Sequence, residues 1–355
     1  MKENNIILDD SQRDVINASV GYHLVLAPPG CGKTQILTER IRAAHAAGVA
    51  YGDMLCLTFT NRAARGMKER MESNIEDDGK SEVYVGNVHR FCSKFLFDNN
   101  VIPAETSVID DADMISIVAQ YLNDDEYAVA ANYKRKREYD TVVWLSSMMY
   151  QIRHLHPKDL RTHADCINKD DLAAMQKICK VRNKTFNADA MLDIYDHTDF
   201  YEEDTRSEAY DIGEQQIITA LLRKMSLAKR YEEYKKQNNL LDFEDLLIRT
   251  YDALSEDKDD KYKRYPWIQI DEVQDLNPMQ LAIVDMITRK IDDVTVMYLG
   301  DEQQAIFSFM GAKMSTLELL KKRCEGNVHR LTQNHRSPKY LLDVFNKYAE
   351  KILNI

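Results

Sequence analysis

A stretch near the start of the chain, LVLAPPGCGKTQ (residues 24–35), has the residue types of a phosphate-binding loop. An apolar run precedes it and a helical pattern follows it, which is the strand, loop and helix frame that such a loop requires. Backbone N–H groups of the later loop residues and of the helix N-terminus would bind the phosphates, so Pro28 and Pro29, which have no N–H, precede the donors. Lys33 would reach the β- and γ-phosphates, and the Thr34 hydroxyl would ligate Mg²⁺. The expected phosphate-binding residues are Pro29, Gly30, Cys31, Gly32, Lys33, Thr34 and Gln35.

A second motif, WIQIDEVQD (residues 267–275), places two carboxylates at the end of an apolar run that reads as a strand. Asp271 suits a position next to Mg²⁺, and Glu272 could orient and deprotonate an attacking water. Adjacent acids after a strand are common on protein surfaces, so this motif alone decides little. Together with the phosphate-binding loop it predicts hydrolysis of a nucleotide rather than binding alone.

The elements that must position these motifs follow an alternating pattern. Short β-branched runs alternate with helical stretches, which is typical of βαβ units on a parallel sheet. From about Ser107 to about Leu240 the sequence is polar, compatible with helix and poor in strand patterns, and it predicts a mostly helical insertion of about a hundred residues. The expected strands are residues 23–27, 54–60, 83–89, 267–273, 294–301 and 327–333.

Composition limits the class of protein. The 355 residues allow about two or three domains, and a hydrophobic content of 44% is ordinary for a globular protein. The apolar stretches are too short to span a bilayer and the N-terminus lacks the apolar core of a signal peptide, so we expect a cytoplasmic protein without a membrane partner. The six cysteines form no CxxC pair, and no His cluster has metal spacing, so neither a disulfide framework nor a zinc site is indicated.

The net charge of −11 argues against a protein that coats nucleic acid by bulk electrostatics, but it leaves room for a local basic groove. The densest basic run is YKRKREY (residues 133–139), with aromatic residues at both ends. Such a run is either a solvated helix face or a nucleic-acid contact surface, and charge alone does not distinguish the two.

Seven blocks in order extend the pattern over nearly the whole chain: LDDSQRDVI, LTFTNRAARGMKERM, VGNVHRFCSKFL, LDFEDLL, IDEVQDLNPMQ, YLGDEQQAIFSFMGA and LTQNHRSP. In this order and spacing they resemble the superfamily 1A helicases, the UvrD/Rep/PcrA group. The resemblance implies an α/β fold, in which a RecA-like P-loop NTPase domain with a parallel sheet carries an inserted, mostly α-helical subdomain. It implies a first motor domain at 1–106 and 226–338, the helical insertion at 107–225, and the start of a second motor domain at 339–355.

The same resemblance implies a function and its residues. An ATP-dependent 3′→5′ DNA helicase would use ATP and Mg²⁺ to move along single-stranded DNA and to unwind duplex at junctions. Gln12 matches a glutamine that reads adenine, and Gln304 matches one that senses the γ-phosphate. Arg336 matches an arginine that touches the γ-phosphate, where it would stabilise the developing charge. His335 stands in the place of a tyrosine that stacks on adenine, and imidazole covers less area.

The resemblance also implies a track for single-stranded DNA. Aromatic faces stack on any base, which suits a track without sequence preference. The alternative for each aromatic residue is core packing, and for the histidine it is an ordinary structural hydrogen bond. The expected DNA-binding residues are Phe59, Thr60, Asn61, His89, Phe307 and Phe309. Gln35 and Met310 replace arginines that relatives have, so they could weaken nucleotide or DNA contacts.

The chain ends in KYLLDVFNKYAEKILNI, an amphipathic stretch soon after Arg336. We therefore expect the N-terminal portion of a longer helicase, in which a C-terminal motor domain completes the ATP site and without which hydrolysis is weak. No pattern in the sequence indicates an oligomeric state.

Other functions stay open at this point. The motor part of a RecB- or AddA-like helicase–nuclease would carry the same blocks, and a nuclease domain downstream would distinguish it. A module that binds nucleotide or DNA without turnover is disfavoured because Lys33, Asp271 and Glu272 are all present. A small-molecule kinase would have no use for the Gln304 block or for an aromatic track.

Overall fold

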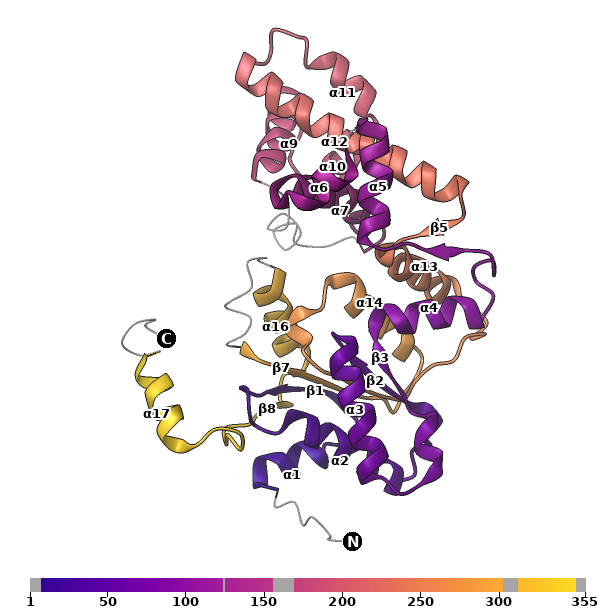
Figure 1. Ribbon diagram of the computed structural model, residues 1–355, viewed down its shortest axis with the longest axis vertical. Coiled ribbons are helices and arrows are strands. Elements are labelled where there is room, and N and C mark those ends of the chain that lie inside the picture. Colours follow the sequence, from indigo (N-terminus) through magenta and orange to yellow (C-terminus); the bar gives the residue numbers. More distant parts are fainter. Residues whose placement is uncertain (1–7, 124, 156–168, 303–311, 349–355) are drawn as a thin grey trace. The chain divides into compact units, whose positions relative to one another are not determined.

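The computed structural model describes residues 8–123, 125–155, 169–302 and 312–348. These residues form two compact units, which are described separately (Figure 1). The first unit holds the described residues up to Phe91 and those from Asp260 onward, apart from Ala312. The second unit is formed by the intervening segment, Cys92–Asp259.

The first unit is built on a six-stranded sheet with the strand order β3-β2-β6-β7-β1-β8. Every pairing in this sheet is parallel. Its strands are β1 (Gly21–Leu26), β2 (Met54–Thr58), β3 (Tyr84–Asn87), β6 (Trp267–Ile270), β7 (Thr295–Gly300) and β8 (Val328–Arg330). The sheet therefore combines strands from both ends of the chain, as the sequence predicted, and the predicted α/β class is confirmed.

Helices cover both faces of this sheet, with α1 and α2 on one side and α14 and α16 on the other (Figure 1). The helices of this part of the chain are α1 (Asp10–Ile16), α2 (Lys33–Ala46), α3 (Asn61–Asn74), α4 (Val88–Asp98), α14 (Pro278–Thr288), α16 (Ala312–Arg323) and α17 (Lys339–Tyr348), with 3-10 turns η1 (Tyr51–Asp53), η2 (Asp78–Glu82) and η3 (Val273–Asp275). Helix α4 begins in the first unit and ends in the second.

The strands are short apolar runs because both faces of the sheet are covered. All five residues of β2 and all four of β6 are buried, as expected for parallel strands between two helical layers. On the side of α1, α2 and α3, one apolar cluster joins helix residues such as Val15, Leu37 and Met67 to strand residues such as Val25 and Cys56. The loops at the carboxyl ends of β1 and β6 carry the predicted phosphate loop and the two predicted acids.

The second unit is almost entirely helical. Its elements are β4 (Ser107–Val108), α5 (Asp111–Leu122), α6 (Glu126–Ala131), α7 (Tyr133–Leu155), α9 (Lys169–Val181), α10 (Ala188–Asp196), α11 (Thr198–Asp204), α12 (Ile212–Gln237), β5 (Leu240–Leu241) and α13 (Phe243–Glu256). Two short strands, β4 and β5, pair in parallel. The expected boundary after residue 225 falls inside α12, because that helix continues without a break to Gln237. The basic run at 133–139 begins α7, and the side chains of 133–137 lie outside the described residues.

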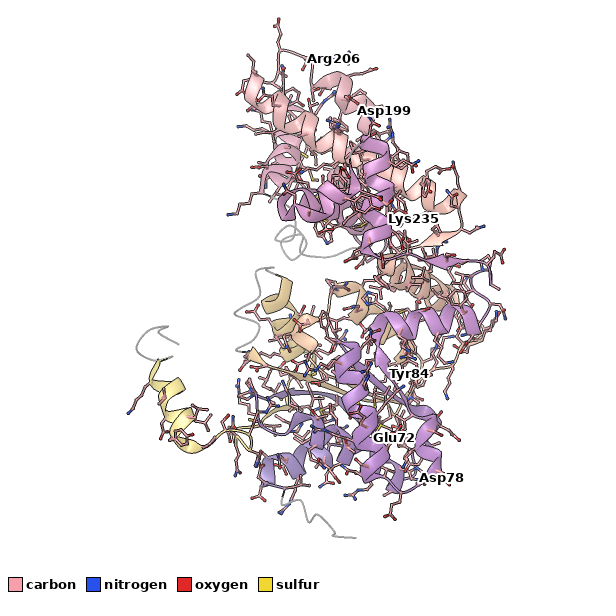
Figure 2. All side chains as sticks on the ribbon, viewed as in Figure 1. Glu72, Asp78, Tyr84, Asp199, Arg206 and Lys235 are labelled. Carbon is pink, nitrogen blue, oxygen red and sulfur yellow. The ribbon has the colours of Figure 1, made fainter. Side chains whose placement is uncertain are left out.

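Two apolar clusters hold the helical unit together. The larger one packs α7, α9, α10 and α12 through residues such as Met149, Met175, Met191 and Leu221. The smaller one centres on α5 and includes Tyr231 of α12. Charged side chains such as Asp199 and Arg206 lie at the surface of this unit, whereas Lys235 is buried (Figure 2).

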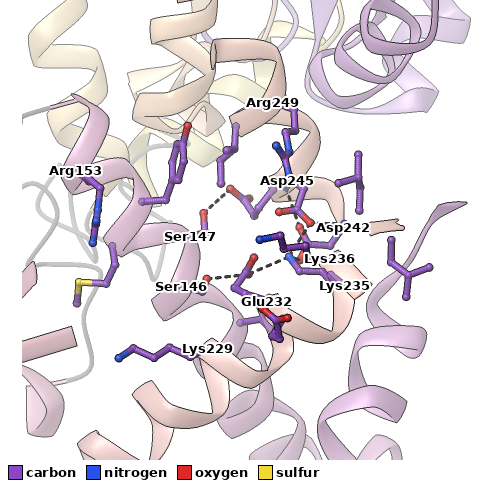
Figure 3. Close-up of a pocket in the computed structure, with 18 of the residues that line it drawn as sticks. Ser146, Ser147, Arg153, Lys229, Glu232, Lys235, Lys236, Asp242, Asp245 and Arg249 are labelled. Carbon is purple, nitrogen blue, oxygen red and sulfur yellow. Dashed lines mark hydrogen bonds and ion pairs between the residues drawn. The ribbon is translucent and has the colours of Figure 1, made fainter. Parts of the chain in front are cut away.

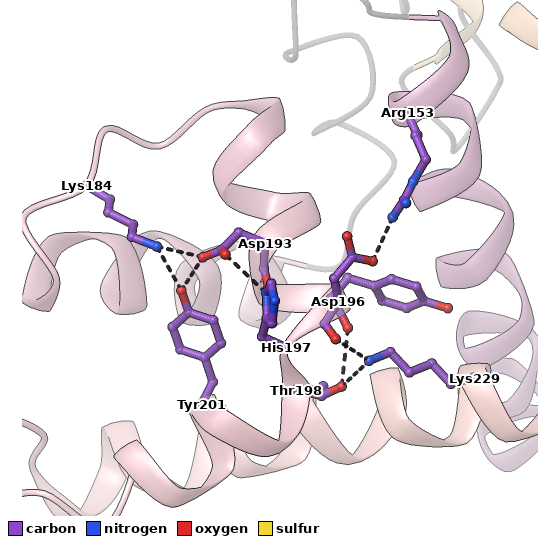
Figure 4. A network of polar contacts seen from close by, with 9 residues as sticks. Arg153, Lys184, Asp193, Asp196, His197, Thr198, Tyr201 and Lys229 are labelled. Atoms are coloured by element: carbon purple, nitrogen blue, oxygen red, sulfur yellow. Dashed lines mark hydrogen bonds and ion pairs between the residues drawn. The ribbon is translucent and has the colours of Figure 1, made fainter.

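Polar contacts reinforce the outer helices of this unit (Figure 4). Lys184 Nζ donates to Asp193 Oδ2 at 2.6 Å on α10. Lys229 Nζ donates to the Asp196 carbonyl at 3.0 Å and to Thr198 Oγ1 at 2.6 Å, which connects α12 to the junction of α10 and α11. The side chains of Lys184 and Asp193 are 47% and 34% exposed, so their ion pair contributes only modestly to stability.

A pocket of about 510 Å³ lies within the helical unit, lined mainly by α7, α12 and α13 (Figure 3). Its charged centre is Lys235, whose ammonium lies 3.0 Å from Glu232, 2.8 Å from Asp242 and 2.7 Å from Asp245. Burial raises the pKa of Asp245 to about 7, with Asp242 acting in the same direction and Lys235 opposing it. One cation thus compensates three carboxylates, and none of the site residues predicted from the sequence lines this pocket.

Replacing Lys235 by Met should strongly destabilise the helical unit, because it removes the cation that forms an ion pair with all three carboxylates. Removing one partner of a buried ion pair typically costs about 3–5 kcal/mol. Urea unfolding followed by circular dichroism measures the loss, which should be smaller at pH 5 because the carboxylates can then bind protons. The matched control is Lys236→Met, since Lys236 is the next residue and is exposed. Equal stability of the two variants would contradict the assigned role of Lys235.

Candidate functional site

The predicted phosphate loop lies between β1 and α2. Gly30 has φ +89° and Gly32 has φ +79°, in the left-handed region that favours glycine. Gly32 is the N-cap of α2, and its carbonyl accepts hydrogen bonds from Gln35 N and Ile36 N in the first turn. Lys33 is the first residue of the helix, so the loop delivers its side chain at the helix N-terminus, where the helix dipole favours anions.

The Lys33 ammonium has an unusual environment. Its side chain is 11% exposed, and Nζ has no hydrogen-bond partner among the described residues. Its only ion-pair neighbour in that part of the chain is Glu272 Oε1 at 3.4 Å, beyond a good hydrogen bond. A buried ammonium without hydrogen bonds is costly, so this group is well suited to an anionic ligand such as a phosphate.

The two predicted acids follow β6, as the sequence indicated. Asp271 N donates to the Leu57 carbonyl at 2.9 Å, which ties the end of β6 to β2. Glu272 then adopts a left-handed conformation with φ 54°, and its N–H donates to Asp271 Oδ1 at 3.0 Å. Burial raises the pKa of Asp271 to about 6, with the Glu272 carboxylate acting in the same direction and Lys33 opposing it.

Gln274 is a site residue that the sequence reasoning did not single out. Its Nε2 donates to Glu272 Oε2 at 2.6 Å, and its Oε1 accepts from Asp301 N at 3.2 Å, just after β7. The side chain is buried. Glu272 is thereby held between Lys33 on one oxygen and Gln274 on the other. The signal was present in the sequence, because Gln274 belongs to the block IDEVQD.

The residues expected at adenine lie together beside the loop. Gln12 is buried in α1, and its Nε2 donates to the Cys31 carbonyl at 3.2 Å. The same nitrogen lies 3.3 Å from His335 Nε2. His335 Nε2 is also 3.4 Å from Asp9 Oδ2. The structure therefore brings Gln12 and His335 together, and adds Asp9, which the sequence reasoning did not consider.

Gln35 and Arg336 have simpler surroundings. Gln35 Nε2 donates to Glu39 Oε1 at 3.0 Å, one turn along α2, so its side chain is directed to its own helix. Arg336 is exposed, and its backbone N–H donates to Asn334 Oδ1 at 2.9 Å. Asn334, another residue not singled out from the sequence, also contacts the loop through the Pro29 carbonyl at 2.9 Å.

Four of the expected DNA-binding residues gather at the carboxyl ends of β2 and β3, which pair with Thr58 opposite Asn87. Phe59 is 44% exposed. Asn87 Nδ2 donates to Asn61 Oδ1 at 3.0 Å, so the segment after β2 is joined to the segment after β3. Thr60 caps α3 by accepting from Ala63 N at 3.1 Å.

His89 lies at the start of α4, on the same edge of the sheet. Burial lowers its pKa, so the imidazole is neutral near pH 7. Gln304, Phe307, Phe309 and Met310 lie outside the described residues.

Comparison with known proteins agrees with this geometry. The family described as UvrD/REP helicase N-terminal domain matches residues 8–325. The chain belongs to this family. It is 26% identical, over 98% of its length, to "ATP-dependent DNA helicase PcrA" of Bacillus subtilis, and 26% identical, over 96% of its length, to "DNA helicase II" of Haemophilus influenzae. The resemblance to the UvrD/Rep group is thus confirmed.

Each alignment covers nearly all of this chain but less than half of the relative. The chain spans about 40% of the length of these two relatives. No helix among the described residues is long and apolar enough to cross a membrane. The described residues also contain no group of three or more His, Cys, Asp or Glu that could hold a metal ion.

Replacing Asp271 by Asn should stabilise the chain when no nucleotide is present. The pKa of Asp271 is raised from 3.8 to about 6, so its contribution to stability is present below pH 4 and is lost as the pH rises through 6. We expect a gain of about 1–3 kcal/mol in the free energy of unfolding at pH 7.5. The gain should be smaller at pH 5. Urea unfolding measures it, with the exposed Asp292→Asn as control; equal stability of both variants at pH 7.5 would contradict the buried-charge assignment.

Proposed function

We propose that this chain is the nucleotide-binding motor part of an ATP-dependent DNA helicase. In this proposal it couples hydrolysis of ATP with Mg²⁺ to 3′→5′ movement along single-stranded DNA and to unwinding at single-strand to duplex junctions. The observation that carries the proposal is the buried Lys33 ammonium, which has no hydrogen-bond partner among the described residues and lies beside Glu272.

The chemistry follows from the positions of these side chains. Lys33 binds the β- and γ-phosphates, because phosphate oxygens supply the hydrogen bonds that its ammonium lacks. When a phosphate binds the Lys33 ammonium, Glu272 Oε2 keeps its contact with Gln274. Glu272 Oε1 then becomes free to orient a water and to accept a proton. Thr34 and Asp271 would hold Mg²⁺, which when bound neutralises charge on the phosphates.

The proposed contacts to adenine and to the γ-phosphate come from α1, which precedes the loop, and from the segment after β8. Gln12 and His335 are proposed to contact adenine, and Arg336 is proposed to stabilise charge on the γ-phosphate. The Gln12 amide already contacts the Cys31 carbonyl and His335. Adenine would therefore bind against a Gln12 side chain whose position is fixed by these contacts.

The proposed DNA track lies at the carboxyl ends of β2 and β3. Phe59 offers an exposed aromatic face on which a base can stack. The first turns of α3 and α4 carry exposed arginines, Arg62, Arg65 and Arg90, close in sequence to Phe59 and His89. These charges suit the phosphate backbone of a single strand, despite the acidic balance of the whole chain.

Replacing Lys33 by Ala should weaken binding of ATP with Mg²⁺ by at least about tenfold, because charge-assisted hydrogen bonds to phosphate are lost. Glu272→Gln should leave binding intact, since it removes only a carboxylate that repels the phosphates, and should lower phosphate release by about 10²–10⁴-fold. Titration calorimetry and a phosphate-release assay measure the two effects.

The control for Lys33 is Lys290→Ala, which removes a lysine that is 44% exposed and paired with Asp260. It should bind nucleotide like the unchanged chain. If Lys33→Ala also bound ATP with unchanged affinity, the assignment of the phosphate site would be wrong.

Replacing Phe59 by Ala should weaken binding of an oligo-thymidine strand by about 5- to 100-fold, since base stacking on an aromatic side chain contributes about 1–3 kcal/mol. Fluorescence anisotropy at one fixed salt concentration measures the change. Tyr127→Ala is a matched control, because Tyr127 is an aromatic residue of α6 that is 79% exposed. A loss of affinity in both variants, or in neither, would count against a specific DNA contact at Phe59.

A further inference from the structure

Asn334 joins the phosphate loop to the segment that follows β8. Its Nδ2 donates to the Pro29 carbonyl at 2.9 Å. Its Oδ1 accepts from Arg336 N and from Ser337 N, both at 2.9 Å. One amide side chain therefore holds the entry of the loop and the backbone of Arg336 at the same time.

The next residue adds a second contact of the same kind. His335 N donates to the Gly30 carbonyl at 2.8 Å. Asn334 also packs closely on Gly30, since a Cβ at that position would lie 2.6 Å from Asn334 Nδ2. Two successive loop carbonyls, those of Pro29 and Gly30, are thus held by the segment after β8.

These carbonyl contacts set the direction of the loop N–H groups. In a planar trans peptide the C=O and the following N–H point in opposite directions. With the Pro29 carbonyl held by Asn334, the Gly30 N–H points away from Asn334. With the Gly30 carbonyl held by His335 N, the Cys31 N–H likewise points away from that segment, and it donates to the Pro28 carbonyl at a long 3.4 Å. Both N–H groups belong to the loop that would wrap the phosphates.

We propose that Asn334 is a positioning residue for the triphosphate: it orients the loop N–H groups and places Arg336 next to the γ-phosphate. This inference rests on the proposed nucleotide site. In this proposal Asn334 acts on the phosphates only through other residues, and its two functions use different atoms. Nδ2 acts on the loop through Pro29, and Oδ1 acts on Arg336 through the backbone.

The separation of the two atoms allows the two functions to be tested one at a time. Asn334→Asp keeps an oxygen that accepts from Arg336 N and Ser337 N, but it loses the donor to the Pro29 carbonyl. Asn334→Ala loses both. Since only a triphosphate has a γ-phosphate, the ratio of the ADP and ATPγS dissociation constants reports the placement of Arg336, whereas affinity for ADP reports the loop.

The experiment is titration calorimetry of the full chain with ADP and with ATPγS, both with Mg²⁺. We expect Asn334→Asp to weaken both nucleotides by a similar factor of about three to ten. We expect Asn334→Ala to weaken ATPγS by a further factor of about ten and so to reduce the preference for the triphosphate. Arg336→Ala should remove that preference, and adding Asn334→Ala to it should change the ratio no further, because the two residues act together.

The matched control is Asn327→Ala. Asn327 Nδ2 also donates to a backbone carbonyl, that of Tyr22 in β1 at 3.2 Å, but at the opposite end of the strand from the loop. It should leave both dissociation constants within about twofold of the unchanged chain. Thermal unfolding of each variant shows whether the chain is folded at the temperature of the titration.

Several outcomes would overturn the inference. If Asn334→Ala binds both nucleotides with unchanged affinity, Asn334 has no positioning role. If Asn334→Ala weakens both nucleotides by the same factor, while Arg336→Ala changes the ratio of the ADP and ATPγS dissociation constants, Asn334 does not position Arg336. If the unchanged chain binds neither nucleotide, the proposed function fails and the inference fails with it. A changed ratio in Arg336→Ala alone would leave the proposed function standing and reject only the role of Asn334.

Discussion

The buried ammonium of Lys33 is the constraint on which the rest of the site depends. Its charge is removed from water without hydrogen bonds from the described residues, and Glu272, at 3.4 Å, is its one ion-pair contact there. That arrangement is unfavourable in the empty site and becomes favourable when an anion binds. The raised pKa of Asp271 has the same origin, since a carboxylate is kept in a buried position where it is difficult to ionise. In the proposed nucleotide site, these charges would be held in place before the nucleotide binds, as in preorganised sites that give up stability for function.

The parallel sheet explains how distant parts of the chain meet at this point. Because every strand pairing is parallel, all the carboxyl ends lie at one edge. Strand β7 lies between β1 and β6, so Gln274 can reach from the end of β6 to Asp301 after β7 while the side chain of Lys33 approaches Glu272. The ends of β2 and β3 continue the same edge, which places the proposed DNA contacts beside the proposed nucleotide contacts within one rigid sheet.

The polar groups of the helical unit stabilise the fold. Its stability depends on two apolar clusters and on Lys235, a single buried cation among three carboxylates. Its pocket is lined by groups that already pair with one another, such as Ser147 with Glu244 and Ser146 with Glu232, so they need no ligand to satisfy them. This contrasts with Lys33, whose environment is incomplete without one. The polar network around Lys235 is complete in the folded helical unit, whereas the surroundings of Lys33 suit an added anion.

The sequence by itself determined the fold class and the helicase family, and it predicted the main site residues, because strand periodicity and motif spacing are local properties of the chain. It also predicted that Lys33 and Glu272 belong to one site. Tertiary structure alone revealed Gln274 between Glu272 and Asp301, the contact of Asn334 with Pro29, and the single compensating charge of Lys235. These depend on which atoms meet across strands and helices that are far apart in sequence. Spacing along the chain cannot specify such distances, since packing of the whole sheet and helix layers sets them.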